Sequence, residues 1–256
     1  MCGIAGLMTA DAGQVPADIL RRLGDALSHR GPDGRREYQA GGVGLVHTRL
    51  AIIDVAGGAQ PLLAERGLGQ RPCALIANAE IYNDLDLRAA MPDARFATGS
   101  DCESALHVYL RHGHRFADRL RGMYAIAIHD PAYAGGRSYL VLARDPFGIK
   151  PLYYAETARG FAFASEPRAL VDAGLVAPVL RREGRDELLA LQFTTGRDTP
   201  FVGIHRVLPG ETLVVEKGRI VNRLRRDALP AGGPAGWNAD EAERRLAAAL
   251  ADSVAR

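Results

Sequence analysis

The first residues of the chain, MCGIAGL, place a cysteine directly behind the initiator methionine. If that methionine is removed, Cys2 carries a nucleophilic thiol and a free α-amino group on one residue. An α-amine has a pKa of about 7.7–8.0, so it can take the thiol proton near neutral pH and act as the base of its own nucleophile. A cysteine at the second codon also occurs without any chemical role, and the remaining sequence has to decide between these interpretations.

The totals describe an ordinary globular protein of 256 residues, with 47% apolar residues, 24% charged residues and a formal net charge of +2. Basic residues are interleaved with acids, so we expect no nucleic-acid partner. The densest basic run, RLRR at residues 223–226, is interpreted as a solvated strand end. No apolar run approaches the roughly 20 residues that span a bilayer, so we expect no membrane partner.

The three cysteines, Cys2, Cys73 and Cys102, are widely spaced. They form neither a disulfide framework nor a metal-ligand pair, so we expect no metal site and a reducing, cytoplasmic location. The N-terminus lacks the pattern of a signal peptide. No glycine-rich phosphate-binding motif is present, so no nucleotide cofactor is expected in this chain.

Short apolar segments bounded by Gly, Pro or Asp predict strands, and their short connections favour antiparallel hairpins. The predicted strands are residues 42–53, 73–77, 123–129, 138–143 and 161–165, with LYYA at 152–155 and a late hairpin over 211–224 that turns at Lys217-Gly218. Helical spacing predicts helices over 17–27, 100–113 (with Ser100 or Asp101 as N-cap) and 187–193. Strand hairpins with separate helices indicate an α+β fold.

The composition changes near the C-terminus. Residues 2–226 form the predicted main domain, and residues 227–238 form a Pro/Gly-rich linker. Residues 239–256 then predict an Asn-capped amphipathic helix, which we interpret as the first helix of a truncated second domain. The alternative is a terminal helix that docks back on the main domain.

Six short motifs occur in a fixed order: CGIAG (2–6), RGPDG (30–34), RLAIIDVAGGAQPL (49–62), NAEIYN (78–83), SDCE (100–103) and ARDPFGIKPLYY (143–154). Together they closely resemble the glutaminase domain of the glutamine-hydrolysing asparagine synthetase family, a class II glutamine amidotransferase of the N-terminal-nucleophile type. The resemblance implies a four-layer αββα sandwich of two antiparallel sheets. It also implies that Cys2 attacks the side-chain amide of glutamine, forms a γ-glutamyl thioester and releases ammonia.

The resemblance carries site roles over to matching positions. Cys2, Asn78 and Ala79 match the catalytic set, in which the Asn78 amide and the Ala79 N–H form the oxyanion hole. Arg49 matches the arginine that holds the substrate α-carboxylate, and Glu80 and Asp101 match the acids that receive the α-ammonium group. Leu50 and Ile52 match positions whose backbone lines the glutamine pocket, with side chains expected in the core.

One position departs from the family pattern, because Ala79 stands where the motif usually has glycine. A methyl group adds bulk beside the substrate and penalises a positive φ. From the sequence we therefore expect either lower glutaminase activity or a tighter pocket.

The remaining candidates take secondary roles. Arg30 and Asp33 match the lid that closes over bound glutamine. His29, His47 and Cys102 are rejected as a Cys–His catalytic set because the α-amine already supplies a base, and Cys73 and Cys102 are expected to be buried, inert thiols. ARDPFGIKPLYY is interpreted as structural, with the hypothesis that Arg144, Asp145 and Lys150 face the route of ammonia.

The predicted function is therefore a glutaminase whose ammonia serves ATP-dependent amidation of aspartate, or a related carboxylate, in a missing C-terminal domain. ATP and Mg²⁺ are expected only for that domain. The expected partners are glutamine, a synthetase domain in cis or trans, and a second copy in a homodimer. Alternatives are an acceptor of a specialised pathway, the branches that make glucosamine phosphate or phosphoribosylamine, and a weakly active scaffolding module.

Overall fold

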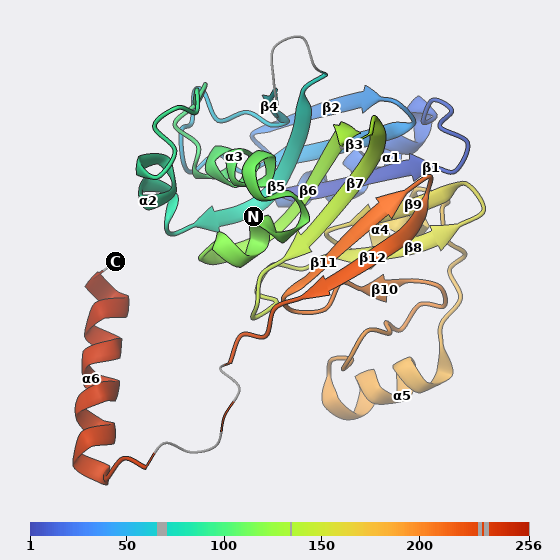
Figure 1. The fold of residues 1–256 in the computed structure, drawn as a ribbon. Helices are drawn as coiled ribbons and strands as arrows, with labels where there is room; N and C mark the ends of the chain where they lie inside the picture. The colour runs from blue at the N-terminus through green and yellow to red at the C-terminus, as the bar shows by residue number, and fades with distance from the viewer. Residues whose placement is uncertain (66–70, 134, 230–231, 233–235, 256) are drawn as a thin grey trace.

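The computed structural model describes residues 1–65, 71–133, 135–229, 232 and 236–255. Two six-stranded sheets, whose neighbouring strands pair antiparallel, face each other (Figure 1). The first sheet has the order β10 (His205–Arg206), β8 (Tyr153–Thr157), β9 (Gly160–Ala164), β1 (Gly3–Thr9), β3 (Val43–Arg49), β2 (Gly34–Ala40). The second has the order β12 (Arg219–Arg225), β11 (Glu211–Glu216), β7 (Arg137–Arg144), β6 (Gly122–Tyr133), β5 (Cys73–Ile81), β4 (Leu62–Ala64).

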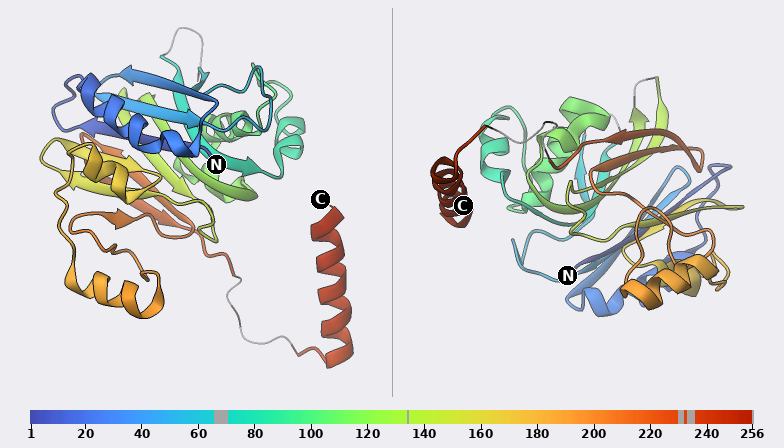
Figure 2. Two further views of the ribbon diagram at one scale, coloured as in Figure 1. Left: turned by 180° about the vertical axis from the view of Figure 1, so that it is seen from behind. Right: turned by 90° about the horizontal axis from the view of Figure 1, so that it is seen from below.

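Helices cover the outer face of each sheet. The first sheet carries α1 (Ala17–Leu27) and α4 (Pro167–Asp172), and the second carries α3 (Asp101–His112) with α2 (Asp84–Ala89) beside it. In the view from below, blue α1 and green α3 lie on opposite sides of the two sheets (Figure 2). The expected αββα sandwich of the α+β class is confirmed.

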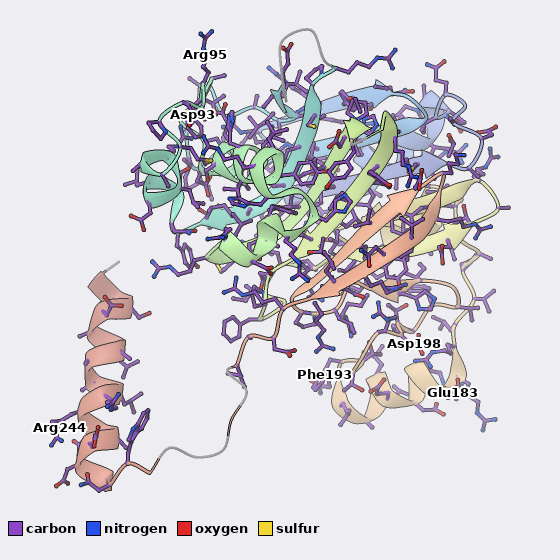
Figure 3. All side chains as sticks on the ribbon, viewed as in Figure 1. Asp93, Arg95, Glu183, Phe193, Asp198 and Arg244 are labelled. Atoms are coloured by element: carbon purple, nitrogen blue, oxygen red, sulfur yellow. The ribbon has the colours of Figure 1, made fainter. Side chains whose placement is uncertain are left out.

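Four further helical segments lie outside this scheme. The 3₁₀ turns are η1 (Ser28–Arg30) and η2 (Gly113–Arg119). Helix α5 (Arg182–Leu191) projects from the sandwich, with exposed Glu183 in its first turn and exposed Phe193 just after its end (Figure 3). Helix α6 (Ala239–Ala255) stands apart from the sheets (Figure 1), and the Asn238 side chain caps it by accepting the Glu241 N–H at 2.9 Å.

The core is divided into three layers by the period-two alternation of the strands. Between α1 and the first sheet lie Leu20, Leu23 and Val46, and between α3 and the second sheet lie Leu106 and Tyr109. The layer between the sheets contains Ile4 and Met8 of β1, Val43 and Leu45 of β3, and Ala74 and Ile76 of β5. Alternate residues of these three strands therefore face the space between the sheets.

Most predicted elements are confirmed, several of them longer than expected, but the strand over 42–53 is wrong beyond Arg49. The Arg49 guanidinium donates to the carbonyls of Ile53, Asp54 and Val55, and Asp54 has φ 46°, so the chain curls into a loop. The sequence did not predict β1, β2, β4, β10, α2 and α4.

The helix expected over 187–193 is present, but its bounds are wrong, because α5 runs from Arg182 to Leu191 and ends where Gln192 adopts a left-handed conformation with φ 64°. The leucines of α5 are exposed, so the sequence has no amphipathic pattern that would show where this helix begins. By contrast, the turn at Lys217-Gly218 is confirmed, with φ 48° and 69° as a two-residue type I′ hairpin requires.

The main domain is continuous through β12, but part of the linker expected at 227–238 lies outside the described residues. That α6 opens a second domain stays a prediction. Among the described residues, no helix is long and apolar enough to cross a membrane.

Candidate functional site

The strand register brings polar residues together at one end of the space between the sheets. The inward-facing positions of β1 extend to Cys2, and those of β3 extend to Arg49. Asn78 and Glu80 occupy inward-facing positions of β5. These four residues, with Leu50, Ile52, Ala79 and Asp101, line a single pocket. The structure therefore gathers all the catalytic and glutamine-binding candidates of the sequence in one place.

Cys2 is half-buried and fixed from both sides. Its Sγ lies 3.4 Å from the Leu50 N–H, which donates to it, and 3.5 Å from the Leu50 carbonyl oxygen. Its backbone carbonyl accepts a hydrogen bond from Arg30 Nε at 3.1 Å. At Gly3 a Cβ would lie 2.5 Å from Thr48 Oγ1, so only glycine lets the terminus lie this close to β3.

Asn78 is 3% exposed, and its Nδ2 donates to no partner among the described residues. Leaving a buried donor unsatisfied costs about 1–3 kcal/mol, so native proteins rarely retain one without a reason. Because this amide faces the pocket that holds the Cys2 thiol, it can donate to an oxygen atom of a bound substrate.

The backbone N–H of Ala79 supplies a second donor. Along β5, the N–H of Ala77 donates to Gln60 Oε1 at 2.5 Å and that of Ile81 to Asp101 Oδ2 at 2.6 Å, both on the side away from β6. Amide directions alternate along a strand, so the Ala79 N–H points the same way. It meets no acceptor among the residues that the structure describes.

The expectation that the Ala79 methyl crowds the substrate is wrong in this structure. Ala79 sits within β5 opposite Tyr124 and is not among the residues with positive φ. Its side chain packs against the core layer between the second sheet and α3, since odd positions of β5 face away from the first sheet. Only its backbone is directed toward the pocket.

Arg49 is partly committed to holding a loop. Its guanidinium donates to the carbonyls of Ile53 (3.3 Å), Asp54 (2.7 Å) and Val55 (3.0 Å), which leaves two of its five N–H groups for a ligand. The Asp54 carboxylate ties the same loop to the start of α3 by accepting the Gly99 N–H at 2.8 Å.

The side chains that follow Arg49 in this loop differ from expectation. Ile52 is 64% exposed and Leu50 is half-buried, so the prediction of core side chains is wrong for Ile52. The loop leaves the sheet after Arg49, and Ile52 therefore lies at the pocket mouth. Both residues line the pocket as the resemblance implied.

Glu80 and Asp101 form the acidic part of the site. Burial raises the pKa of Asp101. Burial and the charge of Asp101 raise the pKa of Glu80, whereas the charge of Lys150 acts to lower it. Asp101 is the first residue of α3, and Ser100 occupies the N-cap position without a side-chain capping bond. Two desolvated carboxyl groups that repel each other are suited to binding a cation.

The lid candidates do not line the pocket. Arg30 is buried behind Cys2, where it also pairs with Glu166 Oε1 at 2.8 Å. Asp33 Oδ2 accepts the Ala51 N–H at 2.8 Å. In this arrangement Arg30 fixes the backbone of Cys2, the candidate nucleophile, and closure of a lid stays a prediction.

Several residues that line the pocket were not assigned to glutamine binding or catalysis from the sequence, among them His47, Gln60 and Lys150. His47 lies two residues before Arg49 on β3, so the strand period alone could have placed it on the same face. Burial lowers its pKa to about 4, which makes it a neutral imidazole at physiological pH. Its Nε2 is buried with no partner among the described residues.

The other thiols and His29 agree with the sequence analysis. Cys73 and Cys102 are buried, and burial raises the pKa of Cys102, which keeps this pocket-lining thiol protonated. His29 contacts Glu166 at 3.0 Å instead of the pocket. Within the described ranges, no three His, Cys, Asp or Glu side chains are grouped so as to hold a metal ion.

Known proteins with similar sequences and structures fit this geometry. The family described as "Glutamine amidotransferase domain" matches residues 1–225. Asparagine synthetase [glutamine-hydrolyzing] 2 of Bacillus subtilis is 39% identical over 66% of this chain and 22% of the relative. A putative asparagine synthetase [glutamine-hydrolyzing] of Mycobacterium tuberculosis is 33% identical, over all of this chain and 42% of the relative. This chain thus spans less than half the length of these relatives.

Among solved structures, the glutamine phosphoribosylpyrophosphate amidotransferase of B. subtilis matches 88% of this chain and 49% of that chain. The TM-score is 0.61 at 22% identity, which supports the fold alone. From its match over residues 1–225, its αββα sandwich and the grouping of its motifs in one pocket, the chain belongs to the glutamine amidotransferase domain family.

Proposed function

We propose that this chain hydrolyses glutamine to glutamate and ammonia at Cys2. The observation that carries the proposal is the pair of unsatisfied donors, Asn78 Nδ2 and the Ala79 N–H, in the pocket that holds the Cys2 thiol. Two donors aimed at one site stabilise the negative oxygen that develops when a thiolate attacks an amide carbonyl.

In the proposed reaction, removal of Met1 first frees the α-amine of Cys2. The amine takes the thiol proton, the thiolate attacks the side-chain amide carbon of glutamine, and the oxyanion is held by Asn78 and Ala79. The carbon–nitrogen bond then breaks, the protonated amine returns its proton to the leaving nitrogen, and ammonia departs. Water, deprotonated by the same amine, attacks the γ-glutamyl thioester, and glutamate leaves as the thiol is restored.

The charged groups of the pocket explain the choice of a free amino acid. The N–H groups of Arg49 that the loop leaves uncommitted can bind the α-carboxylate, and Glu80 with Asp101 can bind the α-ammonium. A residue inside a peptide has neither charge, so it would leave these buried groups unpaired. The pocket therefore favours free glutamine over a glutaminyl side chain.

The relatives named asparagine synthetase suggest the use of the ammonia. They are longer than this chain, so we propose a synthetase domain, in cis or trans, as its partner. That domain would use ATP and Mg²⁺ to activate aspartate or a related carboxylate, which the ammonia then amidates. An acceptor of a specialised pathway is equally compatible with the glutamine pocket, because the pocket does not touch the acceptor.

Mass spectrometry of the mature chain and a glutamine-to-glutamate assay test the proposal. The expected result is a chain that begins at Cys2, and a Cys2→Ala variant whose rate is lower by about a thousandfold or more. Cys73→Ala, which changes a buried cysteine outside the pocket, is the matched control and keeps most of the rate. Equal rates for wild type and Cys2→Ala would leave only a scaffolding role.

A further inference from the structure

The ARDPFGIKPLYY motif forms a loop organised around one buried carboxylate. Asp145 is fully buried, and its Oδ1 accepts the N–H groups of Phe147 (3.1 Å) and Ile149 (2.9 Å). Its Oδ2 accepts those of Lys150 (3.0 Å) and Tyr124 (3.3 Å). Four backbone donors on one carboxylate fix the path of the loop relative to β6.

A buried guanidinium fixes the same loop from its other side. Arg144 donates to the carbonyls of Gly148 (2.6 Å), Lys150 (2.8 Å) and Val207 (2.7 Å). Burying charges is costly unless each is hydrogen-bonded. Arg144 and Asp145 are adjacent buried charges whose hydrogen bonds go to six residues, which indicates that the shape of this loop matters.

The loop presents one side chain to the glutamine pocket. Phe147 and Ile149 are 66% and 53% exposed, whereas Lys150 is 7% exposed and lines the pocket with Cys2 and Glu80. No carboxylate of the described residues forms an ion pair with Lys150. The chain has one other lysine, Lys217, which is exposed at the β11–β12 turn.

Lys150 lies in a balanced group of charges. Glu80 faces charged and titratable groups from several elements: Asp101 and Cys102 on α3, Arg49 and His47 on β3, Cys2 before β1, and Lys150. His47 is neutral, and the Arg49 guanidinium, which keeps its charge, donates to the carbonyls of the loop over 53–55. Lys150 is the buried cation that shares the pocket with the two carboxylates, and its charge acts to lower the pKa of Glu80 against the larger effects of burial and of Asp101.

We propose that Lys150 is a positioning residue for glutamine: the Asp145-centred loop holds it in the pocket, where its ammonium offsets the negative charge of the Glu80–Asp101 pair that receives the substrate α-ammonium. This inference rests on the proposed function. It also assigns the motif a role different from the ammonia route, because Arg144 and Asp145 spend their hydrogen bonds on the loop backbone.

The role predicts a pH-dependent defect. Without Lys150 the pKa of Glu80 rises, so glutamine affinity is lost at a higher pH as the solution is acidified. We expect Lys150→Met and Lys150→Gln to raise the pH midpoint at which glutamine binding is lost on acidification by about half a unit to one unit. Below that midpoint, the affinity for glutamine should fall by about three- to tenfold. Above pH 8, where Glu80 is ionised anyway, affinity stays equal or rises because a cation that repels the substrate ammonium is gone.

Calorimetric titration of glutamine between pH 4.5 and 8.5 tests this in a Cys2→Ala background, which cannot form the thioester. Lys150→Arg keeps the charge and should retain the parent midpoint, and Lys217→Met should change nothing. In a Glu80→Gln background, Lys150→Met should add no further shift of the midpoint.

Weakening by the same factor at every pH, or a Lys150→Arg variant that behaves like Lys150→Met, would overturn the inference in favour of a purely structural lysine. Circular dichroism spectra of each variant establish that the fold is retained. The methionine and glutamine variants are measured in parallel, so that one folded variant still tests the inference if the other fails to fold. If the parent binds no glutamine at any pH, the proposed function itself fails, which is a distinguishable outcome.

Discussion

The two ends of the proposed glutamine pocket are built in different ways. At the reacting end, Cys2, Asn78 and Ala79 are placed by the strands at the inner edge of the two sheets, and their donors are an uncharged amide and a backbone N–H. At the recognition end, Arg49, Glu80, Asp101 and Lys150 are charged groups held by loops, a helix start and a strand end.

This difference separates the consequences of changing each end. Strand register fixes the reacting atoms whatever the charge state of the pocket, so changes there should lower kcat. The recognition end depends on a balance of four charges, so changes there should act on KM and on pH dependence. The predictions below test that division, from the largest effect to the smallest.

Asn78→Ala should lower kcat of glutamine hydrolysis by about 10²–10³, because one donor to the oxyanion is lost. KM should change little, since the donor acts mainly in the transition state. Asn83→Ala is the matched control: its amide bonds to Arg119 O at 3.0 Å outside the pocket. A kcat within threefold of wild type would contradict the assignment.

Arg49→Lys should raise KM for glutamine by about tenfold or more, because a lysine cannot present planar paired donors to the α-carboxylate. It should also lower the melting temperature, since three bonds to the loop over 53–55 are lost. Arg36→Lys, on exposed β2, provides the control for steady-state kinetics and calorimetric melting. If only the melting temperature changed, Arg49 would hold the loop and not the substrate.

Glutamine binding should weaken as the pH falls. The pKa values of Glu80 and Asp101 are raised, so both carboxyl groups become protonated at a higher pH than exposed acids and lose their attraction for the α-ammonium. KM should therefore rise several-fold as the pH falls toward and below 5, while an Asp101→Asn variant should show a higher but flatter KM. The pH profile of kcat/KM measures this, and a flat wild-type profile would argue against the pair.

Ala79→Gly should produce the smallest effect. The methyl packs on the α3 side of the sheet, so its removal should lower the free energy of unfolding by about 0.5–1 kcal/mol without raising kcat. Denaturant titration and steady-state assays measure the two quantities. A clear gain in kcat would restore the sequence-based view that alanine obstructs the pocket.

Sequence reasoning was strongest where pattern and local geometry coincide. The apolar positions of α1 at helical spacing and the left-handed pair Lys217-Gly218 each depend on neighbouring residues alone, and both were predicted correctly. It failed after Arg49 because that arginine bonds to carbonyls further along its own loop, an interaction that an apolar run such as LAII does not reveal. Helix α5 was misplaced because its leucines are exposed and carry no buried stripe.

By itself, the sequence determined the composition of the candidate site, since the proposed nucleophile, the arginine, the asparagine and the acids are given by residue type and motif order. The tertiary structure decided the direction of each group. It turns the Ala79 methyl toward α3 and its N–H toward the pocket, and it turns Lys150 inward while Phe147 and Ile149 point out. The physical reason is that such directions depend on which strand, helix or carboxylate lies opposite, and those partners are distant in the chain.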